Sequence, residues 1–361
     1  MKIQYKKTPV WLVAIALTLL CVRLALPYGV KWYANRVLDK NKDYKGKIET
    51  VDLHLWRGAY SIHGIEIQKV NGKTSVPFFK TEKLDLSLSW KDLIHGKVKA
   101  RLEFDTPEVN FTDGESKAEK QSGKEANWGK MLDELAPFEI SRLIVEKGAV
   151  HFRNVSAKPP VDIWIKEMRA EVENLTNAKG EGQDLFAKAW VEGLAMGNGK
   201  LDVQLQLNPR AEKPTFELNA KLLGLDLTRL NAFFKKYALL DFERGNGDIV
   251  TQISSQNGVL NGYVKPLFKN VDVFSFDKDS QKNKSVFALA WEALADGVVT
   301  LLKNQPKDQF ATKIPVKGKI DAPESDILAM LGGVLSNAFV QAFSPFYDNS
   351  ITIKKVRTVS N

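Results

Sequence analysis

Histidine is the side chain best suited to acid–base or metal chemistry near neutral pH, and the sequence has four. His54, His63, His95 and His151 stand singly in strand-like or turn-like contexts. None has a second histidine four residues away, the spacing with which a helix holds a metal ion. We therefore expect surface or turn positions for all four histidines.

The segment DKDSQKNK is the nearest approach to a calcium loop. Asp277, Asp279 and Gln281 mimic its first three ligands, but Lys282 replaces the turn glycine and Ala288 replaces the bidentate acid. A polar loop before a helix explains this segment without a metal.

Other catalytic signatures are missing from the sequence. It has no phosphate-binding glycine loop, dinucleotide fingerprint or nucleophile elbow. Acids such as Asp133, Glu134, Glu167 and Glu171 could pair in space, but their spacing alone does not separate a catalytic pair from solvated side chains. We expect no catalytic site, no metal and no cofactor, and therefore a protein that is not an enzyme.

The composition is that of a globular protein, with 361 residues, 44% hydrophobic and 26% charged. The net charge is +9, but lysines are interspersed with acids along alternating segments, which is typical of a solvated face rather than a nucleic-acid surface. The single cysteine, Cys21, excludes an intrachain disulfide and a cysteine-based zinc site.

An apolar run near the start resembles a membrane anchor. Residues 10–30 carry one charge, Arg23, and about 20 apolar residues suffice to cross ~30 Å of hydrocarbon. A cleaved signal peptide is the alternative, but LALPYG stands where a small-residue cleavage site is needed. Basic residues after the run argue for the opposite orientation, although long domains are exported with little regard to charge. We expect residues 1–30 to form a cytoplasmic tail and transmembrane signal-anchor, with a periplasmic body.

Alternating apolar and polar residues dominate the rest of the chain. In KLDLSLSWKDLIHGKVKARLEF, two such runs are joined by a turn-like segment, which predicts paired strands with one apolar face. We expect a first β-rich unit at 31–111, an exposed polar loop at 112–127 and a second β-rich unit at 128–284. A helix–strand–helix cap is expected at 285–361.

Two internal similarities indicate repeated strand–turn–strand units. LEFDTPEVNF at 102–111 aligns with LIVEKGAVHF at 143–152, an offset of 41 residues. GNGKLDVQLQL at 197–207 aligns with GNGDIVTQISS at 245–255, an offset of 48. These pairs favour units laid side by side in an elongated architecture.

The expected strands offer more apolar face than the few amphipathic helices can cover. Two arrangements would exclude water: two sheets packed as a sandwich with a dry core, or one long curled sheet with a filled hollow. About 16 strands at ~4.8 Å spacing would make a single sheet roughly 75 Å long. In either case the apolar face includes Val51, Leu53, Leu55, Leu84, Leu86, Leu88, Val98, Leu102, Phe104, Val109, Phe111, Val150, Phe152, Leu201, Val203 and Leu205.

Several segments resemble the AsmA-like superfamily of bacterial envelope proteins, and the resemblance covers most of the chain. They are YKGKIETVDLHLWRGAYSIHGIEIQKVNG, KLDLSLSWKDLIHGKVKARLEFDTPEVNF, FELNAKLLGLDLTRLNAFFKKYALLDFERGNGDIVTQISSQNGVLNGYVKPL and LSNAFVQAF. The resemblance implies a mainly β, β-rich α+β fold in which one inner-membrane helix precedes an elongated, curled antiparallel sheet. That sheet would form a taco-like groove with a few amphipathic helices. In the long members of the family this groove moves phospholipid between membranes.

Two functions follow as expectations. The first is a periplasmic protein, anchored in the bacterial inner membrane, that binds or transfers phospholipid in the groove and supports outer-membrane lipid homeostasis, with no nucleic-acid partner. The second is a scaffold that assists envelope assembly, such as that of outer-membrane proteins, and holds protein partners on strand edges and a C-terminal helix at 324–343.

Overall fold

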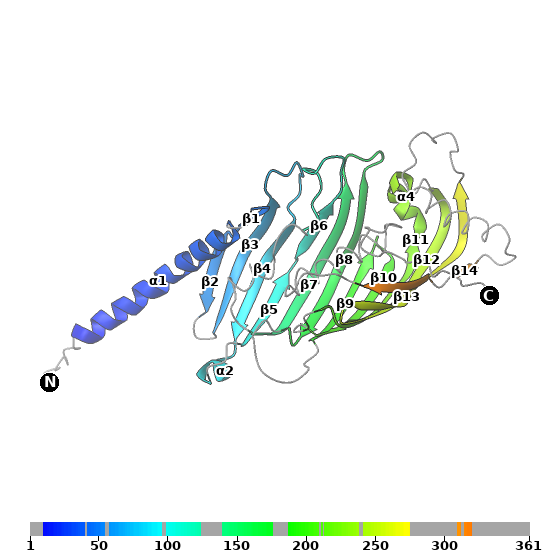
Figure 1. Ribbon diagram of the computed structural model, residues 1–361. Coiled ribbons are helices and arrows are strands. Elements are labelled where there is room, and N and C mark those ends of the chain that lie inside the picture. Colours follow the sequence, from blue (N-terminus) through cyan, green and yellow to red (C-terminus); the bar gives the residue numbers. More distant parts are fainter. Residues whose placement is uncertain are drawn as a thin grey trace, which may run out of the picture.

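A long helix near the N-terminus projects from a large β-sheet (Figure 1). The computed structural model describes residues 10–39, 42–54, 58–95, 99–123, 139–175, 187–208, 211, 213–237, 241–274, 309–311 and 314–319. Helix α1 spans Val10–Leu38. No helix in this described part of the chain has the length and apolar character of a membrane span, so the predicted transmembrane helix lacks structural support.

All the described strands belong to one sheet of fifteen. The order along the sheet is β1-β3-β4-β5-β7-β8-β9-β10-β11-β12-β13-β14. The strands are β1 Tyr44–Lys47, β2 Thr50–His54, β3 Ala59–Lys69, β4 Phe79–Leu88, β5 Lys99–Asp105, β6 Glu108–Thr112, β7 Glu139–Asn154, β8 Val161–Glu173, β9 Ala187–Ala195, β10 Gly199–Leu207, β11 Phe216–Asp226, β12 Asp241–Gln256, β13 Val259–Phe274, β14 Gln309–Ala311 and β15 Ile314–Lys319. The helices after α1 are α2 Trp90–Ile94, the 3₁₀ helix η2 Leu227–Leu230 and α4 Asn231–Tyr237.

The sheet is shorter than the strand count suggests. β1 and β2 both pair with β3, β5 and β6 both pair with β4 and β7, and β14 and β15 both pair with β13. Each of these couples therefore shares one position, and the path along the sheet has twelve positions. At ~4.8 Å per step the sheet is about 50 Å long rather than the expected 75 Å.

The expectation of a wholly antiparallel sheet is wrong at one place. β5 and β6 pair with β7 in parallel, while the other pairings are antiparallel. Antiparallel neighbours can be joined by a tight turn, whereas parallel neighbours need a long crossover. The 26 residues between Thr112 and Glu139 provide that length. The expected boundary at 112–127 accordingly falls within a continuous sheet.

A line of bulges crosses the sheet. Left-handed backbone recurs on neighbouring strand positions, and register shifts accompany it on β7, β8 and β11. Bulges add a residue, re-aim the side chains and increase twist, so the strands bend together along this line, which we call the crease. Its positive-φ residues are Gly64, Thr106, Lys147, Glu167, Gly224 and Asn270.

Helix α4 reveals the direction in which the sheet curls. It contacts β8 and also β12, although three strands separate them in the sheet. Four strand spacings amount to roughly 19 Å on a flat sheet, whereas seven helical residues span only about 10 Å. α4 packs in one apolar cluster with residues of β8 and β12, and the sheet curls toward the face that α4 touches, which is concave (Figure 1).

The structure tests the expected loop at 112–127 and part of the expected helical segments. The predicted exposed loop at 112–127 is wrong for part of its length, because Gln121 is fully buried and Gly123 N donates to the Tyr44 hydroxyl at 2.9 Å. The segment LTRLNAFFKKY at 227–237, which carries apolar residues at helical spacing, forms η2 and α4. The cap expected at 285–361, with its helix at 324–343, lies outside the described residues except for 309–311 and 314–319.

Candidate functional site: the concave apolar face

A row of apolar side chains runs along the concave face. Residues that oppose each other on adjacent strands direct their side chains to the same face of a sheet. The pairing registers therefore place one residue from each of eleven strand positions in a central row. It consists of Leu53, Tyr60, Leu86, Leu102, Leu143, Val172, Ala189, Leu205, Leu218, Ile253 and Gly262.

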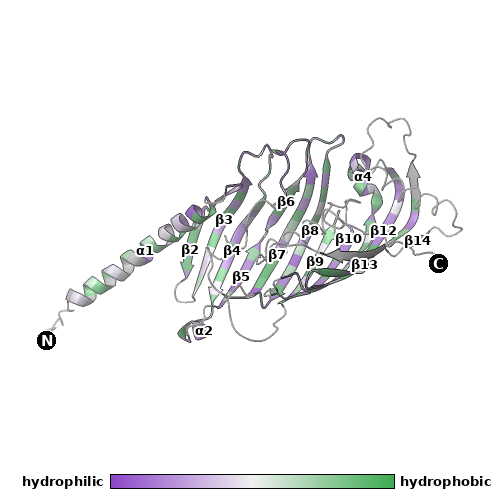
Figure 2. Ribbon diagram, in the orientation of Figure 1, coloured by the Kyte–Doolittle hydropathy of each residue, from purple (hydrophilic) through white to green (hydrophobic). Residues whose placement is uncertain are grey.

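A second row lies beside the first, two residues along each strand. It contains a single polar residue, Thr251. Its members are Val51, Ile62, Leu84, Phe104, Val145, Ala170, Val191, Val203, Ala220, Thr251 and Val264. Figure 2 shows the corresponding alternation of hydrophobic and hydrophilic residues along the strands. The two rows form an uncharged strip along the sheet, which we call the floor.

The residues predicted to form the apolar face are brought together. Eight of them belong to the two rows, and Leu88 and Leu201 flank these rows on the same face. Val109, Phe111, Val150 and Phe152 lie across the crease. The face is continuous there, because the rings of Phe79, which pairs with Val109, and Phe104 are 6.2 Å apart. Leu55 and Val98 lie outside the described residues.

Burial divides this face into covered and open parts. Leu86 and Leu102 are buried in a cluster with Leu175, while Phe111 and Phe152 belong to the cluster that α4 covers. Leu84, Phe104, Val203 and Leu205 are only partly buried. The open part of the floor therefore holds apolar side chains that water still reaches. No second sheet packs on them among the described residues, so the sandwich arrangement is not found there.

The base of α1 covers the N-terminal end of the concave face. Ala34 and Leu38 pack with Tyr44, Ile48 and Val51 in one buried cluster. Two polar contacts fix this junction: Ile48 N donates to Asn35 Oδ1 at 2.9 Å, and Lys31 Nζ donates to the carbonyl of Glu49. The helix is thus held rigidly against the first strands.

The convex face contains the ion pairs of the sheet, although Trp190 and Leu223 are also exposed on it. Lys83 Nζ lies 2.6 Å from Asp85, and Arg101 lies 3.2 Å from Glu103. Burial alone would raise the pKa of Asp85, but hydrogen bonds from Lys83 and Ser61 outweigh it and lower the pKa. Charges are thus kept on the side opposite the floor, which leaves the concave face for apolar contacts.

The described residues contain no group of three or more His, Cys, Asp or Glu side chains that could hold a metal ion. His63 is 3.2 Å from Asp52 on the surface, and His95 is exposed in the turn after α2. The expectation of a surface position is wrong for His151, which is 2% exposed. Asn110 and Trp164 flank it on the neighbouring strands, and its Nδ1 lies 2.7 Å from Asp162 Oδ1. His151 and Arg153 lower the pKa of Asp162 despite the opposing effect of burial.

Sequence reasoning missed several members of the floor. Leu143, Val172, Leu218 and Ile253 lie in the central row beside predicted residues. Their strands were predicted from alternation, and the offset of 48 residues that aligns Leu205 with Ile253 was a usable signal. Which of them remain partly exposed depends on segments far away in the sequence.

Comparison with known proteins identifies no relative. No protein-family model matches the chain, and no curated protein matches it. The resemblance to the AsmA-like superfamily therefore stays a prediction.

Proposed function

We propose that the concave face binds the acyl chains of phospholipids and performs no covalent chemistry. The observation that carries this proposal is the floor itself, an uncharged strip that crosses eleven strand positions and is only partly covered. A continuous apolar strip that remains partly exposed is typical of a surface that binds a ligand or a partner.

The chemistry of the floor suits hydrocarbon. Each methylene group removed from water contributes about 0.8 kcal/mol, and this contribution is not directional. The floor's aliphatic and aromatic side chains can therefore hold chains of varied length without matching polar groups. The ion pairs of the convex face leave that face solvated, so lipid binding is confined to one side of the sheet.

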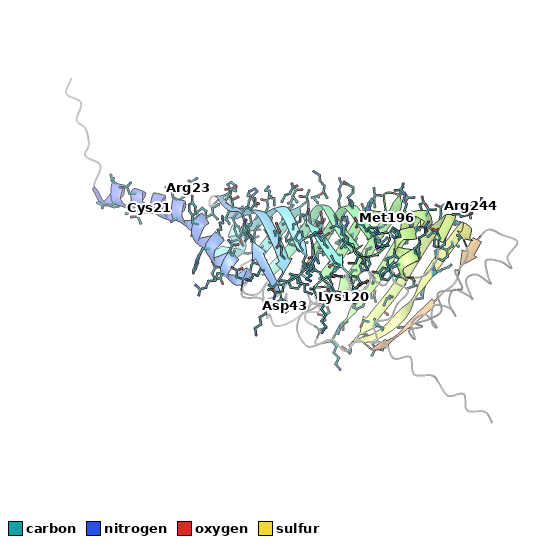
Figure 3. The ribbon with its side chains drawn as sticks, turned by 90° about the horizontal axis from the view of Figure 1, so that it is seen from above. Cys21, Arg23, Asp43, Lys120, Met196 and Arg244 are labelled. Carbon is teal, nitrogen blue, oxygen red and sulfur yellow. The ribbon has the colours of Figure 1, made fainter. Side chains whose placement is uncertain are left out.

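We also propose that α1 attaches the protein to a bilayer. Its projecting part exposes apolar side chains around the helix, among them Trp11, Leu17 and Leu24 at 61%, 56% and 62%. Cys21 and Arg23 lie on this part (Figure 3). A helix that is apolar all round and packs on no other described part of the chain is favoured in lipid. With the basic N-terminal residues in the cytoplasm, the sheet would lie in the periplasm of a bacterial cell, next to the inner membrane.

The size of the sheet limits the transport role. About 50 Å is close to one bilayer thickness of ~40–45 Å. We propose that one copy binds or moves phospholipid over a short distance and so supports outer-membrane lipid homeostasis, as the AsmA-like resemblance implies. A longer bridge would need further copies or partners.

Mass spectrometry of the sheet without its apolar anchor tests the proposal. Residues 29–361 keep Val30, Ala34 and Leu38, which pack on the first strands, and this fragment would be exported and purified without detergent. We expect at least one phospholipid per chain. Folded, lipid-free protein would contradict the lipid proposal and favour the envelope-assembly scaffold.

The membrane attachment has its own test, because Cys21 is the single cysteine and is exposed. In full-length protein reconstituted in nanodiscs, a membrane-impermeant maleimide should label Cys21 much more slowly than in detergent-solubilised, urea-unfolded protein. Equal labelling would exclude insertion of this part of α1.

A further inference from the structure

The base of α1 carries a second concave feature, separate from the floor. An open hollow of about 570 Å³ is lined by six residues of the helix's last turns. They are Tyr28, Lys31, Trp32, Asn35, Arg36 and Asp39. Ala34 and Leu38 of the same turns pack on the sheet, and the lining residues Lys31 and Asn35 bond to the strand corner at Glu49 and Ile48, so the hollow lies beside this junction.

Its lining combines aromatic and cationic side chains. Tyr28 is 77% exposed and Trp32 is 61% exposed, although aromatic rings of this size are usually well buried. Arg36 lies over the Trp32 ring, 5.1 Å from its centroid. Stacking leaves the edge of the guanidinium, with its fork of N–H donors, available for an anion.

The charges in the hollow favour an anionic ligand. Lys31 and Arg36 outnumber Asp39, and Lys31 and Asn35 are held in place by their bonds to the strand corner at Ile48 and Glu49. Among the described residues Arg36 has no carboxylate partner within ion-pair distance. A group that presents phosphate oxygens beside apolar matter would satisfy both Arg36 and the exposed rings.

The place of the hollow along α1 narrows the choice of ligand. It begins where the apolar run of residues 10–30 ends. Tyrosine, tryptophan and arginine are enriched at this level of membrane proteins, where rings meet headgroups. We propose that Tyr28, Trp32 and Arg36 form a binding site for the phosphate headgroup of a membrane phospholipid, Arg36 binding the phosphate and the rings flanking the glycerol. This inference rests on the proposed attachment of α1 to a bilayer.

Native mass spectrometry of the full-length chain in a neutral detergent tests the site. The probe is dihexanoylphosphatidylglycerol, whose short tails minimise binding to the floor. We expect a one-to-one adduct that weakens at least about tenfold in Arg36→Glu, because repulsion replaces a charge-assisted hydrogen bond. Trp32→Ala should also weaken it. Lys200→Glu, the same charge change on an exposed residue of β10, should not.

Further measurements separate the headgroup site from a phosphate site and from binding on the floor. Equal affinity for inorganic phosphate would overturn the lipid assignment in favour of a phosphate site. An adduct that persists in Arg36→Glu but disappears in Leu205→Asp would place the probe on the floor and overturn the headgroup site. Labelling of Cys21 in nanodiscs reports attachment of α1 separately, so failure of the site is distinguishable from failure of the anchor.

Discussion

The hydroxyl of Tyr237 in α4 donates a 2.7 Å hydrogen bond to Asp113, 124 residues earlier in the chain and just beyond β6. The same hydroxyl accepts a 2.8 Å bond from Asn154 at the end of β7. Asp241, four residues after Tyr237, begins β12. These contacts connect two regions of the sheet across its concave side.

Tyr237→Phe should therefore loosen the curl. It leaves Asp113 and Asn154 without this partner, and we expect a loss of about 1 kcal/mol in the free energy of unfolding, measured by urea denaturation. Tyr263→Phe, which removes an exposed hydroxyl bonded to Gln252, is the control and should cost less. Equal effects of the two variants would contradict a structural role for the Tyr237 contact.

Tyr237 should also make stability depend on alkaline pH. Burial, together with the neighbouring Asp113, raises the pKa of Tyr237 above its ordinary value of 10.0. A raised folded-state pKa stabilises the fold fully below the unfolded-state value, and this contribution is lost as pH rises above it. From about pH 10 upward, the stability of the wild type should fall relative to that of Tyr237→Phe. Parallel stability curves for the two proteins would contradict this expectation.

Gly224 tests the crease without a steric clash. Its φ is +73°, and a Cβ placed there would meet no atom within 4 Å. Gly224→Ala should therefore cost about 1–2 kcal/mol from backbone strain alone. Gly29→Ala, also free of contacts but within α1, should leave the free energy of global unfolding unchanged or slightly raised. A neutral Gly224→Ala would mean that this bulge does not constrain the strand.

Three neighbouring substitutions on β10 separate an open floor from a dry core. Leu205 is partly buried, Leu207 is 1% exposed and Gln204 is exposed on the convex face. Leu205→Asp should fold and release lipid, whereas Leu207→Asp should lose more than about 3 kcal/mol of stability. Gln204→Asp should change neither property. Global unfolding of Leu205→Asp, followed by circular dichroism, would contradict an open floor.

Alternation was sufficient to predict the strands of the sheet and eight residues of the floor. The two internal offsets were more informative still, because their aligned residues turn out to share a register. Phe104 with Val145 and Phe111 with Phe152 are parallel neighbours, while Leu201 and Ile249 both pair with Leu222. A pattern that repeats at a fixed offset therefore located equivalent positions on nearby strands.

Other features could not be read from the sequence for physical reasons. The left-handed conformation of Lys147 or Glu167 is set by neighbouring strands, since neither residue type favours it. The reach of α4 to Asp113 is a contact over a long sequence separation, and local patterns carry no information about it. The burial of Leu86 beside the open Phe104 likewise depends on Leu175, from a distant segment.

The position of α4 limits how much of the concave face is accessible. A helix with its side chains is roughly 10–12 Å wide, and α4 occupies this width within the curl of the sheet. Among the described residues, α4 covers Phe111 and Phe152, whereas Phe104 and Leu205 stay partly exposed. The area of the concave face that remains for apolar contacts is therefore set by where this short helix lies.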